Sequence, residues 1–229
     1  MTPDARTRER LLAAGRSLFG EKGFRKVTVR ELAKEAGANV AAVNYHFGDK
    51  EGLYREVMQV TVNAIRETSE AARIAGEGQP PEVQLRRYIG VFLNRILRPG
   101  AETVHKLLIR EMSDPTPALD DLIEKALRPR IQYLAGLVSA IMGVDPSDPR
   151  VMRCVGSIQS QAIMYRHHPG ASKIQRVFKP TEDDIDVVAD HIATFSLGGI
   201  RAVAENRLAE ASRGRARRNA RASQSARKH

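Results

Sequence analysis

Apolar residues recur along most of the chain at intervals of three and four, which is the period of an amphipathic α-helix. A first apolar stripe, from Leu11 to Phe19, predicts a helix over about residues 4–20, and Gly23 is placed to end it. Similar stripes predict helices over residues 28–36, 39–45, 53–74, 82–97, 101–113, 117–143, 149–166 and about 181–210, of which the 117–143 helix is expected to be bent or broken near Pro129. Because no run of alternating apolar and polar residues marks a sheet, the predicted fold is all-α.

Breaks in these stripes divide the chain into three parts. We expect a three-helix N-terminal domain over residues 1–50 and a larger helical body over 51–212, in which residues 51–74 form a linking helix. The Gly- and Pro-rich stretch 76–82 separates this helix from the rest of the body. Residues 213–229 are expected to form a disordered basic tail.

The spacing of small and capping residues between residues 28 and 43 predicts a helix-turn-helix. Thr28 and Glu31 have the spacing of a capping box, in which each side chain binds a backbone amide of the other residue. Ala33 is small enough for a close helix crossing, Gly37 tolerates positive φ at the turn, and Val43 can anchor the second helix. This spacing alone also fits a generic helical hairpin.

The composition of the second helix favours DNA binding over the generic hairpin. It starts at Asn39, is short, and exposes small and polar residues, so it contributes little to a core. These residues are candidate DNA contacts: Asn39, Ala41, Ala42 and Asn44. Such a helix fits the major groove of DNA. Candidate phosphate-binding groups surround it in the sequence: Thr28, Arg30, Tyr45, His46 and Lys50.

The span from about residue 7 to 60 resembles the N-terminal domain of the TetR family of bacterial transcriptional regulators. The resemblance rests on the arrangement Thr28-x-Arg30…Ala33…Gly37…Tyr45-His46-Phe47…Lys50-x-x-Leu53. It implies a helix-turn-helix that binds DNA. The residues that would face the bases or the groove are Arg30, Val40, Ala41, Ala42 and Asn44, and those that would hold phosphates are Thr28, Tyr45, His46 and Lys50. Since residues 40–42 offer no side-chain hydrogen bonds, Arg30 and Asn44 are the expected polar base contacts.

The body, residues 82–212, shows a weaker resemblance to the CecR-type subgroup of the same family, in Arg110-Glu111 with the following DPTPAL and in SIQSQAIMYRHHP. The family fold implies a domain that binds an effector and dimerises. A small, largely apolar effector is expected among the body helices, with candidate pocket residues Phe92, His105, Ile109, Leu134, Gln161 and Tyr165. Helices 149–166 and 183–210 are expected to form a four-helix bundle across a two-fold axis, through Ile158, Ala162, Ile192 and Phe195.

Composition and charge add a second feature that fits an anionic polymer as partner. The chain of 229 residues has a formal net charge of +10, with seven Arg or Lys and no acid in residues 213–229 and a net +4 in residues 1–50. Apolar runs are too short for a membrane span, no secretory signal is visible, and the lone Cys154 excludes an internal disulfide framework. A cytoplasmic protein with no membrane association is expected.

Candidate catalytic and metal chemistry is sparse in this sequence. His167-His168 has no third ligand spaced nearby, so neither a metal nor another cofactor is predicted. His105, Arg110 and Glu111 share one helix and suit either buried ion pairs or polar groups of a pocket. With no catalytic motif present, the predicted function is a sequence-specific DNA-binding regulator, most simply a homodimeric repressor that a small molecule releases from a double-stranded operator. The alternatives are sequence-indifferent nucleic-acid binding through the tail, and an enzyme with a vestigial DNA domain.

Overall fold

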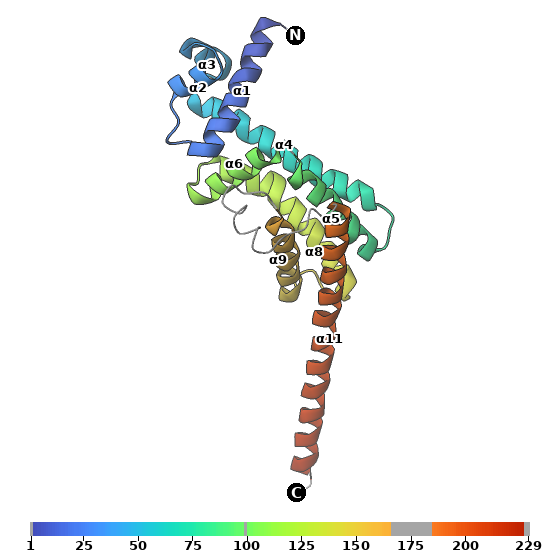
Figure 1. The fold of residues 1–229 in the computed structure, drawn as a ribbon. Helices are drawn as coiled ribbons and strands as arrows, with labels where there is room; N and C mark the ends of the chain where they lie inside the picture. The colour runs from blue at the N-terminus through green and yellow to red at the C-terminus, as the bar shows by residue number, and fades with distance from the viewer. Residues whose placement is uncertain (1, 99, 166–184, 227–229) are drawn as a thin grey trace, which may run out of the picture.

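The chain folds into a series of helices that run from a small N-terminal group into a larger body (Figure 1). The computed structural model describes residues 2–98, 100–165 and 185–226, and the side chains through residue 205. Its elements are α1 (Pro3–Lys22), α2 (Val29–Glu35), α3 (Val40–Phe47), α4 (Lys50–Gly76), α5 (Pro81–Leu97), α6 (Ala101–Ser113), α7 (Ala118–Leu122), the π-helical turn η1 (Ile123–Leu127), α8 (Arg128–Met142), α9 (Pro149–Met164) and α11 (Ile185–Ala226). The described residues contain no strand, which confirms the predicted all-α class.

The N-terminal core is built from the stripes that predicted its helices. Leu11 and Phe19 of α1, Leu32 of α2, Val43 of α3 and Leu53 of α4 are all buried in one cluster. This cluster continues along α4 and reaches Leu107, Leu122 and Ala126 in the body. Helices α1 and α4 therefore pack against α6, α7 and η1. A displacement of these body helices acts on α1 and α4 by direct contact.

A second core lies among α5, α8, α9 and the first half of α11. Its fully buried side chains include Leu85, Leu93, Leu134, Val151 and Ile192. Cys154 is also buried here, and burial raises the pKa of its thiol, as expected for a small core residue rather than a reactive one. This core holds together the helices that we expected to form the dimerisation and effector-binding body.

The bend expected near Pro129 is a change of helix type. The backbone N–H of Arg128 bonds to the carbonyl of Ile123, five residues back, which is the π-helical pattern. Pro129 follows directly and has no N–H with which to continue the α-helical ladder. The helix predicted over 117–143, bent or broken near Pro129, is therefore three consecutive segments, α7, η1 and α8.

The structure differs from the prediction for the C-terminal tail. Helix α11 continues through Ala226 and extends away from the body in Figure 1, whereas residues 213–229 were expected to be disordered. The segment is rich in Ala and Arg, which have high intrinsic helix propensity, and this explains the continuation. The predicted start of the last helix, near residue 181, and the pair His167-His168 lie outside the described residues.

Part of α11 is apolar enough to resemble a membrane span. Residues Ile185–Glu205 pass a test of length and hydropathy for crossing a membrane, and 39% of the window is buried inside the protein. The buried side chains, among them Val188, Ile192 and Ile200, belong to the body core. Packing in that core accounts for much of the apolar character of this helix.

Candidate nucleic-acid interface and body cavity

The helix-turn-helix begins at a fully formed capping box. The Thr28 amide donates to Glu31 Oε2 at 2.8 Å, and the Glu31 amide donates to Thr28 Oγ1 at 3.2 Å. Lys22 Nζ also donates to Glu31 Oε1 at 2.7 Å. The Lys22 ammonium and the Thr28 donors hold the pKa of Glu31 at about 2. The capping box is therefore confirmed, and both Thr28 and Arg30 are exposed beside it.

The turn between α2 and α3 has the geometry that the spacing predicted. Gly37 adopts a φ of +58°, which a side chain would strain, while Ala33 and Val43 are buried at the helix crossing. Asn39 caps α3, because its Oδ1 accepts a hydrogen bond from the Ala42 amide at 2.8 Å. Asn39 is thus exposed at the start of α3 with its side-chain oxygen engaged by the helix itself.

The outer face of α3 is open to solvent. Val40 is 42% exposed and Tyr45 is 78% exposed. Ala41 and Asn44 are exposed too, whereas Ala42 is half-buried against the N-terminal core. Exposed apolar and aromatic side chains on so short a helix contribute little to folding, so this face is available for contact with another molecule.

Lys50 has a structural role that its sequence position did not reveal. Its Nζ donates hydrogen bonds to the carbonyls of Phe24 at 3.1 Å and Val27 at 3.0 Å. The same atom lies 4.4 Å from the centroid of the Phe24 ring. Lys50 therefore fixes the connection between α1 and α2, and of the three donors of an ammonium group two are used within the protein.

His46 is placed differently from the other predicted phosphate ligands. Its side chain is only 7% exposed, and Nε2 lies 3.5 Å from Asp4 Oδ1 on α1. Contact with Asp4 joins the end of α3 to the start of α1. Of the five predicted phosphate-binding groups, Arg30 and Tyr45 are exposed, and Thr28 is exposed with its hydroxyl bonded to Glu31 in the capping box. Lys50 and His46 are held by contacts within the protein.

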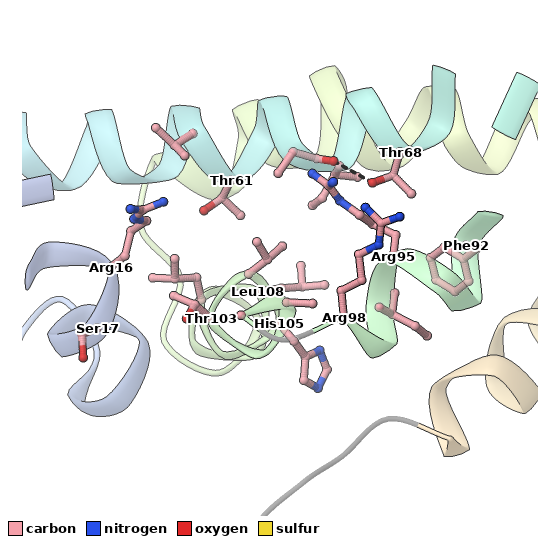
Figure 2. A pocket seen from close by; sticks show the side chains of 18 of the residues that line it. Arg16, Ser17, Thr61, Thr68, Phe92, Arg95, Arg98, Thr103, His105 and Leu108 are labelled. Atoms are coloured by element: carbon pink, nitrogen blue, oxygen red, sulfur yellow. Dashed lines mark hydrogen bonds between the residues drawn. The ribbon is translucent and has the colours of Figure 1, made fainter. Parts of the chain in front are cut away.

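A cavity of about 580 Å³ lies between the N-terminal domain and the body (Figure 2). Its lining residues come from α1, α4, α5, α6 and the start of α8. This volume is within the usual range for small-molecule sites. The residues of α1 and α4 in its wall place the cavity directly against the helices that carry the helix-turn-helix.

Two of the six predicted pocket residues line this cavity, and four do not. Phe92 and His105 lie in its wall. Ile109 is exposed, and Leu134 is buried in the body core. Gln161 donates to Ser196 Oγ at 3.2 Å, and Tyr165 packs against the core near the end of α9. The sequence missed the four arginines in the wall, which are Arg16, Arg95, Arg98 and Arg130.

The residues expected at a dimer interface fall into two groups. Ile158, Ala162 and Ile192 are buried in the core of their own chain, so they have no surface to offer a second subunit. Phe195 is 65% exposed on α11. The helical period located the apolar positions of each helix, but it did not separate those buried in the chain's own core from those exposed on its surface.

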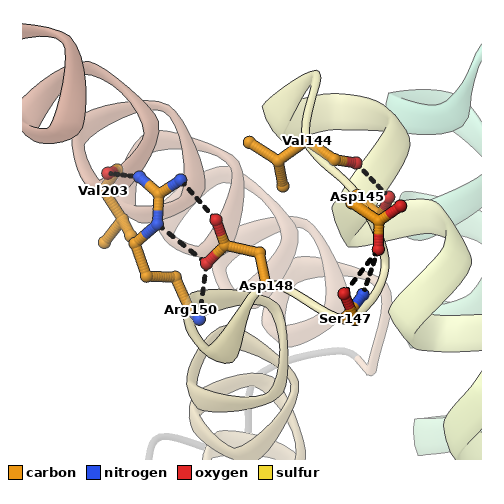
Figure 3. Close-up of polar contacts among 7 residues, drawn as sticks. Val144, Asp145, Ser147, Asp148, Arg150 and Val203 are labelled. Carbon is orange, nitrogen blue, oxygen red and sulfur yellow. Dashed lines mark hydrogen bonds and ion pairs between the residues drawn. The ribbon is translucent and has the colours of Figure 1, made fainter.

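Helices α9 and α11 are joined at one end by a partly buried polar contact (Figure 3). Asp148 caps α9 and binds the Arg150 guanidinium through both carboxylate oxygens, at 3.0 and 2.8 Å. Arg150 Nη1 then donates to the Val203 carbonyl of α11 at 3.1 Å. This contact fixes how the two helices lie relative to each other.

Adjacent residues of α6 bind the N-terminal domain. Arg110 donates to the carbonyls of Gly20 and Glu21 at the end of α1. Glu111 is buried and accepts a hydrogen bond from the Tyr54 hydroxyl of α4. His105, which lies on the same helix, lines the cavity instead. Helix α6 therefore forms part of the cavity wall and also makes hydrogen bonds to α1 and α4.

No group of three or more potential metal ligands occurs among the residues that the structure describes. The features on the described part of the chain are thus an exposed helix-turn-helix, a neighbouring cavity and a helical body. Together they define a helix-turn-helix DNA-binding protein with an attached helical domain.

Comparison with known proteins gives the family. The model of the bacterial regulatory proteins of the tetR family matches residues 11–57, and the model of the C-terminal domain of the HTH-type transcriptional dual regulator CecR matches residues 81–200. The chain therefore belongs to the TetR family of bacterial transcriptional regulators and has a CecR-like body. This makes it a DNA-binding regulator rather than an enzyme.

Individual relatives agree with this assignment. The chain is 29% identical over 168 residues to the dual regulator CecR of Shigella flexneri, covering 69% of this chain and 75% of the relative. It is 28% identical over 225 residues to the regulatory protein RaaS of Mycobacterium tuberculosis, covering 94% and 96%. A solved TetR-like regulator from Rhodococcus sp. RHA1 shares the fold, with a TM-score of 0.57, 20% identity and coverage of 87% and 98%.

Proposed function

We propose that this regulator is a homodimeric repressor that acts in the cytoplasm and leaves its operator when a small molecule fills the body cavity. The single observation that carries the proposal is the position of the cavity, whose wall includes Arg16 of α1 and Thr61 of α4. A ligand there touches the helices that hold the DNA-binding surface. It need only bind more tightly to the form of the protein that fits the operator poorly.

On DNA, α3 lies in the major groove. Asn44 and Arg30 make the polar contacts to bases, and Val40, Ala41 and Ala42 approach thymine methyl groups. Thr28, Tyr45 and the remaining donor of Lys50 bind phosphates. Asn39 and His46 act chiefly by holding α3 in place, through the Asn39 cap and the contact of His46 with Asp4.

In the dimer, α9 and α11 of two subunits form a four-helix bundle. The exposed apolar side chains on these helices are the natural contacts: Met152, Ile163, Met164, Val187 and Phe195. A two-fold axis through this bundle would place two α3 helices on successive major grooves, about 34 Å apart. The operator is then a near-palindrome, and its half-site spacing reports the distance between the two α3 helices.

The coupling runs through α6. A ligand that displaces α6 from α5 moves Arg110 and Glu111 together, and with them the end of α1 and the start of α4. Because both contacts are direct hydrogen bonds, a small displacement of α6 changes the orientation of each DNA-binding domain. This is a differential contact of the kind that a two-state switch requires.

The decisive experiment is selection of bound sequences from random double-stranded DNA by the purified full-length protein. We expect a two-fold symmetric motif, and its loss with Asn44→Ala. A matched protein lacking residues 213–229 tests the alternative of sequence-indifferent binding through the basic tail. If binding is lost with the tail and Asn44→Ala has no effect, the repressor proposal is wrong.

A further inference from the structure

The charged groups in the wall of the body cavity are all cationic. Its wall contains Arg16, Arg95, Arg98 and Arg130 together with His105, and no Asp or Glu occurs among its described lining residues. Arg95 has a carboxylate neighbour outside the wall, because Glu67 Oε2 lies 3.7 Å from Arg95 Nη2, and the Glu67 side chain is 72% exposed. Four arginines with a single, solvent-exposed carboxylate beside them favour an anionic occupant.

The arginines are not evenly placed around the cavity. In Figure 2, Arg95 and Arg98 lie at one end with Thr68 and Phe92, and Arg16 lies at the opposite end on α1. Arg130 approaches the same end as Phe92, since its Cζ lies 5.3 Å from the centroid of that ring. Its buried Nε has no hydrogen-bond partner among the described residues. At this end of the cavity, the Arg130 Nε–H is therefore a buried donor that a ligand could satisfy.

The N-terminus of α6 adds to this positive end. Gly100, Ala101, Thr103 and Val104 line the cavity, and Gly100 supplies no capping side chain. Backbone amides of the first helical turn favour an anion close to them. Glu102, the acid of that turn, is exposed and is not among the lining residues.

Apart from these cationic groups and a few threonines and a serine, the wall is mainly apolar. The side chains that form it include Val60, Ile65, Ile96, Leu107 and Leu108. Three of these are almost fully buried, namely Ile65, Ile96 and Leu107. Such a surface binds hydrocarbon rather than a small inorganic ion, so the cavity combines clustered cationic groups with an apolar surface.

From this arrangement we propose that the cavity binds an anionic amphiphile, a molecule with a carboxylate or phosphate group and an extended apolar part. The anion pairs with Arg95 and Arg98, next to Arg130, and the apolar part lies along Ile65 and Leu108 toward α1. As the identity of the effector, this inference rests on the proposed function. The effector expected from the sequence was largely apolar. The arginines in the wall instead favour a ligand that is selected by its negative charge.

The test uses four probes of equal chain length, below their micelle concentrations, and full-length protein without DNA. Decanoate and decyl phosphate carry an anion, decanol is neutral, and decyltrimethylammonium is cationic. Calorimetry should show saturable binding of both anions, at least about 10-fold weaker binding of decanol, and no binding of the cation. A comparison of decanoate with decanoyl-coenzyme A then distinguishes a free acid from a phosphate-bearing thioester as the source of the anion.

Variants of one helix provide matched controls. Arg98→Met and Arg95→Met should each weaken decanoate binding about 10- to 100-fold and leave decanol binding unchanged. Arg87→Met, an exposed position on α5 that does not line this cavity, should change neither. Circular dichroism and thermal unfolding of each variant verify that it is folded.

The inference is overturned if no anionic probe binds saturably, if decanol binds as tightly as decanoate, or if both cavity variants keep the parent affinity. These results leave the regulator proposal intact as long as DNA selection still yields a symmetric motif. Conversely, selective binding of decanoate by a protein that shows no sequence preference on DNA supports the ligand inference and refutes the repressor proposal.

Discussion

The hydroxyl of Tyr54 on α4 donates a hydrogen bond to the buried carboxylate of Glu111 on α6, 57 residues further along the chain. The same carboxylate accepts hydrogen bonds from the Thr116 amide at 3.2 Å and from its hydroxyl at 3.1 Å. Burial and the nearby carboxylate raise the pKa of Tyr54, so the tyrosine remains a neutral donor. This contact links the DNA-binding end of α4 to the helix that forms a wall of the cavity.

Tyr54→Phe should therefore destabilise the protein by about 1–3 kcal/mol, because it removes one donor from a buried carboxylate and leaves only Thr116. Urea unfolding measures the change. Tyr45→Phe is the matched control, since Tyr45 is exposed, and it should alter stability by less than about 0.5 kcal/mol. A double-mutant cycle of Tyr54→Phe with Glu111→Gln should show a coupling energy of about 0.5–3 kcal/mol, and additive effects would contradict the contact.

Substitution of Arg30 or Lys50 should affect DNA binding similarly but protein stability differently. If both bind phosphates, Arg30→Ala and Lys50→Ala should each lower the slope of log K against log salt by about one. Only Lys50→Ala should also lower the free energy of unfolding, by about 1–3 kcal/mol, because Lys50 binds the Phe24 and Val27 carbonyls. Fluorescence anisotropy over a salt series and urea unfolding separate these effects. A slope unchanged by Lys50→Ala would assign this residue to structure alone.

The helix-turn-helix could be predicted from the sequence because its determinants are local. A capping box, a glycine at the turn and an anchoring valine each act within a few residues of their partners, so spacing carries the information. The structure adds what spacing cannot show. The side chains of Asn39 and Lys50 form hydrogen bonds within the protein, and His46 is covered by contact with α1.

The cavity and the outer surface of the body could not be predicted in the same way. The cavity wall combines α1, α4, α5, α6 and α8, and no period within one helix reports that Arg16 and Arg98 line the same space. Likewise, the apolar stripe of α11 places Ile192 in the chain's own core and leaves Phe195, three residues later, outside. Which face turns inward depends on how α11 packs on α5 and α9, and that is settled only by tertiary structure.

The low pKa of Glu31 predicts an acid-sensitive capping box. Because the folded-state pKa of about 2 is below the ordinary value of 4.5, ionised Glu31 stabilises the folded state above about pH 4.5. This contribution is lost as the pH falls from there toward 2. Glu31→Gln should flatten this part of the stability–pH curve, measured by thermal unfolding. Glu35→Gln, at an exposed position on the same helix, is the control and should leave the curve unchanged.

Phe195 and Ile192 test the dimer surface separately from the core. Phe195 is 65% exposed, so Phe195→Arg should leave the subunit folded and shift sedimentation from dimer to monomer. Operator affinity should fall with it, since two linked α3 helices bind far more tightly than one. Ile192 is 1% exposed, and Ile192→Arg should unfold the body instead, because it buries an unpaired charge. A folded, dimeric Phe195→Arg protein with full operator affinity would exclude this face of α11 as the interface.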